Sequence, residues 1–185
     1  MSASTGFALF ETAIGTCGVA WGPIGVVGLV LPESSRGVAA DRLAHRSPGL
    51  VEAAPPFPPP IDRLIRDVRG LLDGAHIDLG AVTIDLSRVP EFDRRVYEVA
   101  RGIPPGQTLT YGDVAARLGD SGLARAVGQA LGRNPFPIVV PCHRVVAAGG
   151  EIGGFSAAGG AATKRRMLAI ESAQGVLPFT NSRIR

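Results

Sequence analysis

The chain has 185 residues, a formal net charge of +3 and only two cysteines, Cys17 and Cys142. That length allows one large domain or two small ones, and either can bury a core of its own. The two cysteines lie far apart without a C-x-x-C pattern, which argues against a disulfide framework and a structural zinc site. We therefore expect two small domains, no metal or other cofactor, and a protein of the reducing cytoplasm.

Charge is shared unevenly between the two halves of the chain. Residues 1–89 carry a net charge of −2, whereas residues 90–185 carry +5. A basic half is typical of proteins that bind an acidic partner, nucleic acid being the commonest, although many basic halves are simply solvated. Charge alone therefore favours a nucleic-acid partner only weakly.

The first expected elements lie in an uncharged stretch, residues 13–31, which is nearly long enough to cross a bilayer. Five glycines and a proline interrupt it, and these residues are more typical of turns between short strands than of a membrane helix. We expect no membrane span. The stretch instead predicts a buried hairpin or meander with strands at residues 7–12, 16–21 and 25–31.

Helices and one more strand complete the first half. A short helix is expected around residues 36–45, and the proline-rich residues 53–60 form a connector because each proline removes an amide donor. Apolar residues then recur at helical spacing through residues 61–72, with charged residues on the other side, which predicts an amphipathic helix. Residues 82–86 are the last expected strand, so residues 1–89 form an α+β domain.

Residues 90–175 are expected to form a mainly helical domain, and residues 176–185 a flexible tail. One helix is expected soon after the start of this domain. The next spans "LTYGDVAARLG", where Thr110 and Asp113 have the spacing of a capping box. Tyr111 therefore lies in the first turn of that helix, a position that also suits an ordinary tyrosine at the edge of a core.

The stretch "LARAVGQALGRNP", residues 123–135, divides into three stripes when it is wound as a helix at about 100° per residue. Two glycines inside a helix each cost about 1 kcal/mol relative to alanine, so their presence needs an explanation. A smooth cationic surface that closes on DNA explains the glycines and the arginines, whereas close helix packing explains only the glycines. We therefore assign the smooth and polar stripes to DNA binding. The stripes are Leu123, Val127 and Leu131 (apolar), Ala124, Gly128 and Gly132 (smooth), and Arg125, Gln129 and Arg133 (polar).

The helices expected at residues 111–118 and 123–135 form a helix-turn-helix pattern, whose second helix normally enters a DNA groove. The following "RVVAAGGEIGGF" predicts a hairpin that turns at Gly149 and Gly150, as in the wing of a winged helix. We therefore expect double-stranded DNA as the partner.

Cys142 follows a short expected strand at residues 138–140. A lone cysteine in such a place is more often buried than reactive, and a nucleophilic thiolate needs a base or a positive charge beside it. His143 can serve as that base if a water or a helical turn brings the two side chains together, because neighbours in an extended segment point to opposite sides. Glu171, on a last helix at residues 161–172, is one of several acids that could orient the imidazole.

The segment Pro141 to Val145, "PCHRV", resembles the active-site motif of the O6-alkylguanine-DNA alkyltransferases, also called methylated-DNA–protein-cysteine methyltransferases. The similarity runs from about Pro90 to Glu171 and includes "TYGDVA", "ARAVGQAL", "RNP" and "GGEIGGFS". It implies a winged helix-turn-helix domain after an RNase H-like first domain, a monomer without cofactor, and double-stranded DNA containing O6-alkylguanine as substrate. The first domain shares only a general layout of strands and a helix with the family, and it lacks a metal-binding pattern of the family.

The resemblance also implies roles for individual residues. Cys142 would take the alkyl group directly from O6 of guanine, with His143 and Glu171 forming a water-linked relay that generates the thiolate. Tyr111 would help to neutralise the departing guanine. Arg125 would enter the duplex through the minor groove and fill the gap left by the extruded nucleotide.

Further residues are implied to shape the site. Asn134 would brace the active-site turn, and the Val145 carbonyl and the Ser156 amide would bind the guanine edge. Phe155 stands where the family often has a tyrosine, and the loop "SAAGGAATK" is longer than its commonest form, so both features bear on which alkyl groups fit. A thioether on Cys142 resists hydrolysis, so the protein is expected to act once.

Two other classes of protein compete with this interpretation. A winged-helix regulator or lesion-sensing relative would bind DNA without chemistry, but a sensor whose cysteine has been replaced would not have Cys142. A cysteine hydrolase could use Cys142 and His143, yet it would explain neither the glycine-arginine helix nor Tyr111.

Overall fold

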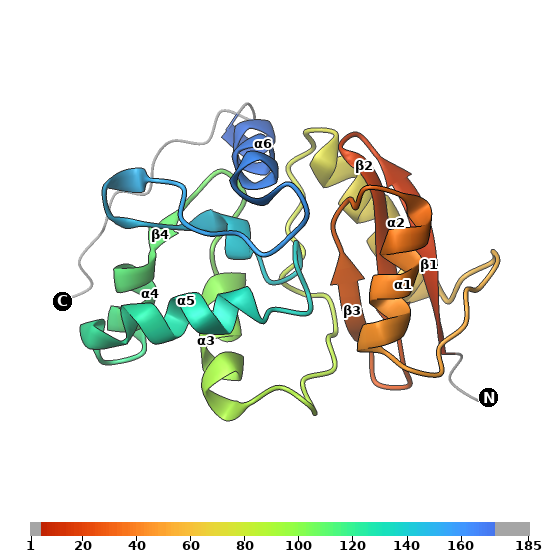
Figure 1. The fold of residues 1–185 in the computed structure, drawn as a ribbon, viewed down its shortest axis with the longest axis horizontal. Coiled ribbons are helices and arrows are strands. Elements are labelled where there is room, and N and C mark those ends of the chain that lie inside the picture. Colours follow the sequence, from red (N-terminus) through yellow and green to blue (C-terminus); the bar gives the residue numbers. More distant parts are fainter. Residues whose placement is uncertain (1–4, 173–185) are drawn as a thin grey trace.

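The computed structural model describes residues 5–172 (Figure 1). The strands and helices of the first half gather at one end of the molecule, and the helices of the second half gather at the other. This arrangement confirms the expected α+β class, whereas the domain boundary after residue 89 and the RNase H-like comparison stay predictions. The expected tail, residues 176–185, lies outside the described residues. Within residues 5–172, no helix combines the length and the apolar character that crossing a membrane requires.

A three-stranded antiparallel sheet forms the centre of the first half. Its strands, in spatial order, are β1 (Gly6–Thr12), β2 (Gly15–Trp21) and β3 (Val26–Val30). The expected meander is therefore confirmed. Cys17 lies on β2 opposite Phe10 and is fully buried. Burial raises the pKa of the Cys17 thiol to about 12, so this cysteine is an unreactive core residue.

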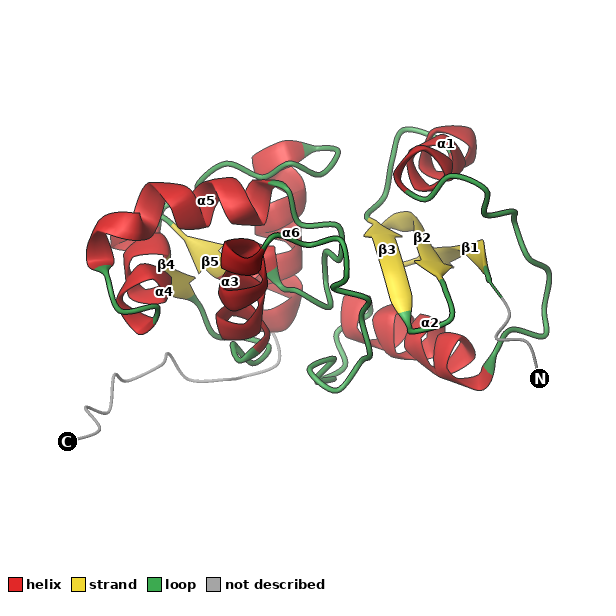
Figure 2. Ribbon diagram, turned by 90° about the horizontal axis from the view of Figure 1, so that it is seen from below, coloured by secondary structure: helices red, strands yellow, loops and turns green. Residues whose placement is uncertain are grey.

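Two helices cover the opposite faces of this sheet, as Figure 2 shows: α1 (Arg36–Arg46) lies on one side and α2 (Pro59–Leu72) on the other. Both helices were expected from the sequence. The apolar stripe of α2 is buried against the sheet, and each such side chain contributes about 1.5–3 kcal/mol on leaving water. Its buried residues are Ile61, Leu64, Ile65, Val68, Leu71 and Leu72.

The strand expected at residues 82–86 is wrong. Only Ile84 makes a bridge with Val26 of β3, supported by hydrogen bonds from Val26 N to Thr83 O and from Asp85 N to Val26 O. Beyond this bridge the backbone amides have other partners: Leu29 N donates to Pro135 O at 2.8 Å, and Ser87 N donates to Asp85 Oδ1 at 2.9 Å. The segment therefore does not continue as a ladder along β3.

The second half is mainly helical, as expected. It contains α3 (Glu91–Arg101), α4 (Tyr111–Arg117), α5 (Ala124–Gly132) and α6 (Gly160–Ser172), together with a short parallel pair of β4 (Leu109–Thr110) and β5 (Val145–Val146). The predicted capping box is present: Asp113 N donates to Thr110 Oγ1 at 3.0 Å, and Thr110 N donates to Asp113 Oδ2 at 2.8 Å. Helix α4 and helix α5 therefore form the expected helix-turn-helix, with Tyr111 in the first turn of α4.

The wing differs from the expected hairpin. Gly149 and Gly150 do form the turn, with φ values of 78° and 79°, and Ala147 N donates to Glu151 O at 2.8 Å. The returning arm is not a strand, and β5 pairs with β4 instead. The "GG" of the returning arm, which includes Gly153, has a low propensity for strands.

The strand expected at residues 138–140 is also wrong. Ile138 has a φ of 76°, which is outside the strand region, and Val140 N donates back to Phe136 O at 2.7 Å. The chain folds into a tight turn here because the side chain of Asn134 binds both of its ends, as described below. A β-branched residue with positive φ is strained and persists only where its surroundings impose it.

Candidate active site

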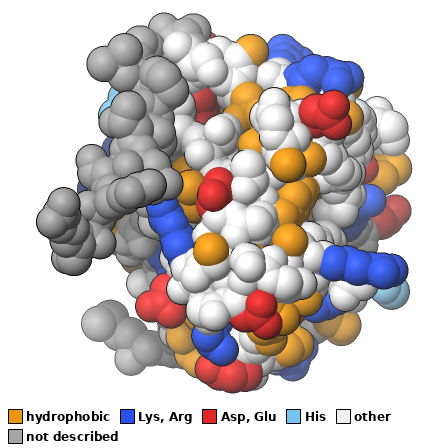
Figure 3. All heavy atoms as spheres, turned by 90° about the vertical axis from the view of Figure 1, so that its left-hand side faces the viewer, with side chains coloured by type: hydrophobic (Ala, Val, Ile, Leu, Met, Phe, Trp, Pro, Cys, Tyr) orange, Lys and Arg blue, Asp and Glu red, His pale blue; other side chains and the backbone are white. Residues whose placement is uncertain are grey.

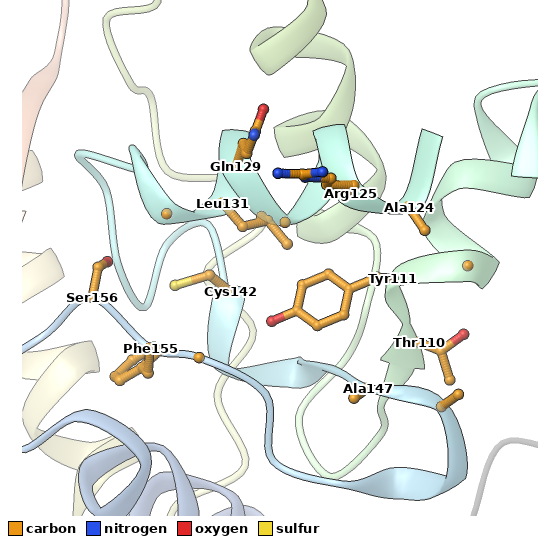
Figure 4. A pocket seen from close by; sticks show the side chains of 15 residues that line it. Thr110, Tyr111, Ala124, Arg125, Gln129, Leu131, Cys142, Ala147, Phe155 and Ser156 are labelled. Atoms are coloured by element: carbon orange, nitrogen blue, oxygen red, sulfur yellow. The ribbon is translucent and has the colours of Figure 1, made fainter. Parts of the chain in front are cut away.

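A pocket of about 880 Å³ lies between α4, α5 and the segment at residues 147–156 (Figure 4). It brings together side chains from parts of the chain that are far apart in sequence. Most of the residues that the sequence analysis assigned to the site line it. These are Tyr111, Ala124, Arg125, Gly128, Gln129, Gly132, Cys142, Phe155 and Ser156.

Cys142 begins a single 3-10 turn, Cys142–Arg144, so the helical turn expected between this cysteine and His143 is present. The thiol is buried, with 8% of the residue exposed. Burial raises the pKa of the Cys142 thiol, while the Asn134 side chain and the positive charge of Lys164 act in the opposite direction and favour the thiolate. The nucleophile is thus desolvated but has groups beside it that stabilise its negative form.

Asn134 holds the turn that leads to Cys142. Its Nδ2 donates to Val140 O at 2.9 Å, and its Oδ1 accepts from Phe136 N at 2.9 Å. Cys142 N in turn donates to Val140 O at 2.8 Å. The bracing geometry expected for Asn134 is therefore present in the structure.

His143 and Glu171 lie side by side in the core behind the cysteine. His143 Nε2 is 2.9 Å from Glu171 Oε1, and both side chains are almost completely buried. Burial lowers the pKa of His143, although the Glu171 hydrogen bond and charge raise it in part. A neutral imidazole donates its Nε2 proton to the carboxylate, so Nδ1 remains as a proton acceptor. The structure thus selects Glu171 among the acids that the sequence left open.

Arg144 is a buried residue that the sequence analysis missed. Its guanidinium donates to both oxygens of Glu171, from Nε to Oε2 at 3.0 Å and from Nη2 to Oε1 at 2.8 Å, and its Nη1 donates to Ile103 O at 2.6 Å. Burial opposes ionisation of Glu171, but the hydrogen bonds from His143 and Arg144 and the positive charge of Arg144 outweigh it and lower the pKa of Glu171 to about 2. Arg144 therefore keeps the carboxylate ionised behind the imidazole.

Lys164 is the second residue that was missed. It is fully buried, and its Nζ donates to Val145 O at 2.6 Å. The same ammonium group lies 5.7 Å from the ring centroid of Tyr111 and 6.0 Å from that of Phe155. Burial lowers the pKa of Lys164, and the nearby Cys142 acts against this shift. Its spacing of seven residues from Glu171, which places both on one face of α6, was a signal in the sequence.

The Val145 carbonyl lies next to Lys164, and its expected contact with guanine stays a prediction. Val145 does not line the pocket, and its carbonyl already accepts the hydrogen bond from Lys164. A carbonyl has two lone pairs, so contact with a base edge would have to share this oxygen with the lysine. Ser156, by contrast, is exposed at the rim of the pocket.

Tyr111 is half-buried, and Figure 4 shows its hydroxyl pointing toward Cys142. Its ring is flanked by two glycines: a Cβ on Gly128 would lie 3.7 Å from the ring, and one on Gly153 would lie 3.0 Å from the hydroxyl. A Cβ on Gly128 would make only ordinary van der Waals contact with the ring, so packing against Tyr111 does not by itself require a glycine there. A Cβ on Gly132 would meet no atom within 4 Å among the described residues, so this glycine is left open for a partner's approach.

The two arginines of the polar stripe have different surroundings. Arg125 is exposed at the edge of the pocket, whereas Arg133 binds the buried carboxylate of Asp93 on α3 and does not line the pocket. The buried carboxylate of Asp93 needs a positive partner, which Arg133 provides, and the expected contact of Arg133 with DNA stays a prediction.

The described side chains on the face of the molecule shown in Figure 3 are of mixed charge. Figure 3 shows the end of the molecule that carries α4 and the start of α5, where Lys and Arg side chains are scattered among acidic and uncharged ones. Charge alone does not mark a binding face there. The case for DNA binding depends on α5 and on the pocket below it.

Comparison with known proteins identifies the family. Residues 91–173 match the family model described as "6-O-methylguanine DNA methyltransferase, DNA binding domain". A methylated-DNA–protein-cysteine methyltransferase of Methanothermobacter thermautotrophicus is 39% identical over 154 residues, which cover 83% of this chain and 78% of that protein. The chain belongs to the methylated-DNA–protein-cysteine methyltransferase family. The matched region contains every residue that lines the pocket.

Solved structures of other methylated-DNA–protein-cysteine methyltransferases have the same fold over nearly the whole chain. Mycobacterium tuberculosis OGT in complex with DNA is 30% identical, with a TM-score of 0.72 over 91% of this chain and 93% of that one. The O6-methylguanine-DNA methyltransferase of Pyrococcus kodakaraensis is also 30% identical, with a TM-score of 0.69 over 92% and 99% of the two chains. The likeness includes the strand-containing first half.

Proposed function

We propose that this chain repairs DNA by moving the alkyl group of an O6-alkylguanine onto its own Cys142, once per molecule. The observation that carries the proposal is the placement of Cys142. Its thiol faces a pocket that Tyr111 and Arg125 also line, and His143 and Glu171 lie hydrogen-bonded in the core behind it.

The first step is formation of the thiolate. Glu171, ionised by its contacts with Arg144, holds the Nε2 proton of neutral His143, so Nδ1 accepts the thiol proton of Cys142, directly or through a water. The nearby Lys164 charge favours the negative sulfur. The buried site therefore contains a proton acceptor and a positive charge for the one group that must ionise.

Transfer then exchanges one bond for another. The sulfur attacks the alkyl carbon, a C–S bond forms, and the bond between that carbon and O6 breaks. Guanine leaves with the electron pair and needs a proton, which the Tyr111 hydroxyl is placed to supply. Burial raises the pKa of Tyr111, so its proton is present at neutral pH. His143 holds the proton that it took from the thiol. Passing this proton on to the tyrosinate gives Tyr111 its hydroxyl proton back.

The product is a thioether, which water does not hydrolyse as it would a thioester. Within residues 5–172, the other cysteine is Cys17, buried in the sheet of the first half, so it cannot accept the alkyl group from Cys142. The reaction is stoichiometric.

The target base must leave the helix to reach a pocket of this kind. Arg125 stands at the pocket edge on α5, next to the smooth residues Ala124 and Gly128. It is the side chain best placed to enter the duplex and occupy the vacated position, which offsets part of the cost of extrusion. We place this activity in the cytoplasm, on nucleoid DNA.

The test uses a duplex oligonucleotide with one O6-methylguanine. After incubation, intact mass and peptide mapping should show that each protein molecule has gained one methyl group on Cys142, with an equal amount of guanine restored in the DNA. Binding of the duplex without any mass change would instead support the competing class, a lesion-sensing protein.

A further inference from the structure

The end of α5 is held by side chains and backbone from two other elements. Tyr97 of α3 donates its hydroxyl proton to Ala130 O at 3.0 Å. Leu29 N of β3 donates to Pro135 O at 2.8 Å. Between these two contacts, Arg133 of the same segment binds Asp93 of α3. The segment that connects the helix expected to face DNA with the turn before Cys142 is therefore anchored at three points along residues 130–135.

The ion pair is the strongest of these contacts by geometry. Arg133 Nε donates to Asp93 Oδ2 at 3.1 Å, and Nη2 donates to Oδ1 at 2.9 Å, so the pair is bidentate. The Asp93 side chain is only 3% exposed, whereas that of Arg133 is 58% exposed. Asp93 is therefore the fixed partner, and the guanidinium lies across its buried carboxylate.

The positions of Asp93 and Arg133 along their helices also favour this ion pair. Asp93 lies in the first turn of α3, where a helix stabilises negative charge, and Arg133 is the C-cap residue of α5, where a helix stabilises positive charge. The pair thus joins the start of one helix to the end of the other.

Arg133 and Arg125 also point in different directions around the helix axis. Eight residues at about 100° each carry Arg133 about 80° around the helix from Arg125. That rotation agrees with the observed contacts, because Arg125 lines the pocket while Arg133 faces α3.

We propose that Asp93 and Arg133 are positioning residues for alkyl transfer: their pair fixes the end of α5 and, through the adjoining Asn134, the turn that presents Cys142. Arg133 connects directly to Asn134, whose side chain holds Val140 O and Phe136 N. A loosened helix end would let this turn shift, and a reacting atom that is misplaced by about 1 Å can slow a reaction by about a hundredfold. The inference rests on the proposed function.

The experiment compares Asp93→Asn and Arg133→Gln, singly and together, with the exposed Arg165→Gln of α6 as the matched loss of one positive charge. Each protein is reacted with free O6-benzylguanine, which needs no DNA contact, at a temperature where its circular dichroism shows it folded. We expect both single variants to react roughly tenfold or more slowly, and the double variant to be no slower than the slower single one because the two residues act as one unit.

DNA binding is measured in parallel in a Cys142→Ser background, where no reaction consumes the complex. We expect the salt dependence of duplex binding to be the same for Arg133→Gln as for the unchanged residue. A shallower salt dependence for Arg133→Gln, with Asp93→Asn reacting at the normal rate, would identify Arg133 as a phosphate contact and overturn the proposal.

A lower melting temperature with unchanged rates in both variants would also overturn it, since the pair would then only stabilise the fold. If Arg133→Gln does not fold, Tyr97→Phe provides the second measurement, because it removes only the hydroxyl contact with Ala130 O and should slow the free-base reaction in the same way. Failure of the proposed function is distinct: the unchanged protein itself would then show no transfer.

Discussion

Lys164 Nζ donates a hydrogen bond to the Val145 carbonyl at 2.6 Å, and this buried ammonium group also lies over the rings of Tyr111 and Phe155. Burying a lysine side chain is costly unless its ammonium group is hydrogen-bonded or paired with a negative charge. The same charge favours the thiolate of Cys142. Lys164 of α6 thus lies close to two aromatic residues that line the pocket, Tyr111 and Phe155, and to the thiol of Cys142.

Replacing Lys164 by methionine, which keeps a long apolar side chain, should therefore raise the pKa of the Cys142 thiol. With less thiolate present at neutral pH, transfer should slow by roughly tenfold or more. The measurement is the pH dependence of Cys142 alkylation by iodoacetamide, with Arg165→Met as the control. An unchanged pH profile in Lys164→Met would mean that the lysine acts only through packing.

Cys142→Ser should abolish transfer and keep DNA binding, because an alkoxide is far harder to form at neutral pH than a thiolate. Cys17→Ala should transfer at the normal rate, because Cys17 is a core residue of the sheet. Rates on the methylated duplex and binding by gel shift check both variants. Methyl loss from DNA with Cys142→Ser, or none with a folded Cys17→Ala, would contradict the assignment of the nucleophile.

Glu171→Gln should slow transfer while the affinity for alkylated DNA stays near normal, since this change weakens the orientation of His143 and removes no contact at the pocket. A rate per bound complex equal to that of the unchanged protein would show that another group supports the histidine. Single-turnover kinetics at saturating DNA give that rate directly.

Glu171 should also make stability depend on pH. Its pKa is lowered from 4.5 to about 2 in the folded protein, so its ionised form contributes about 3 kcal/mol that is present above pH 4.5 and is lost as pH falls toward 2. The stability difference between the unchanged protein and Glu171→Gln should therefore shrink between pH 5 and pH 3. Urea unfolding at several pH values measures it, with exposed Glu98→Gln as control. A difference that stays constant with pH would contradict this.

Arg125→Ala should slow repair of duplex DNA strongly, by roughly ten- to a hundredfold, because extrusion of a base costs a few kcal/mol that an inserted side chain offsets in part. Reaction with free O6-benzylguanine needs no extrusion and should stay near normal. The ratio of the two second-order rates is the measurement, with Arg165→Ala as control. Equal losses on both substrates would show that Arg125 supports the pocket instead.

Gly153→Ala should slow transfer on both substrates. A Cβ at this position would lie 3.0 Å from the Tyr111 hydroxyl and ring, so the tyrosine would have to move away from its place in the pocket. Gly37→Ala on α1, outside the pocket, is the control, since a Cβ there would make only ordinary contact, 3.8 Å from Ser35 Oγ. Equal rates for both variants would show that the position of Tyr111 does not limit transfer.

Short-range patterns in the sequence predicted much of the fold correctly. The uncharged, glycine-punctuated stretch predicted β1 to β3, the apolar period predicted α2, and the spacing of Thr110 and Asp113 predicted the cap of α4. Each of these depends on residues a few positions apart, whose geometry is the same in any fold. Cys142 and His143 were singled out by a contiguous motif that resembles the family's active-site motif, and their roles stay predictions.

Local sequence patterns did not predict which charged side chains form ion pairs, nor whether the short segment at residues 82–86 becomes a strand; these depend on the tertiary structure. Spacing alone left several acids open for His143, and only the family resemblance singled out Glu171, which packing places 2.9 Å from the imidazole. Spacing also placed Arg133 on the polar stripe, but it could not predict the ion pair with Asp93, forty positions earlier. The segment at residues 82–86 did not become a strand, because Leu29 N and Ser87 N donate to Pro135 O and to Asp85 Oδ1 and do not extend the single bridge. A buried charge binds whichever opposite charge the packed helices bring within reach, and local spacing carries no information about that choice.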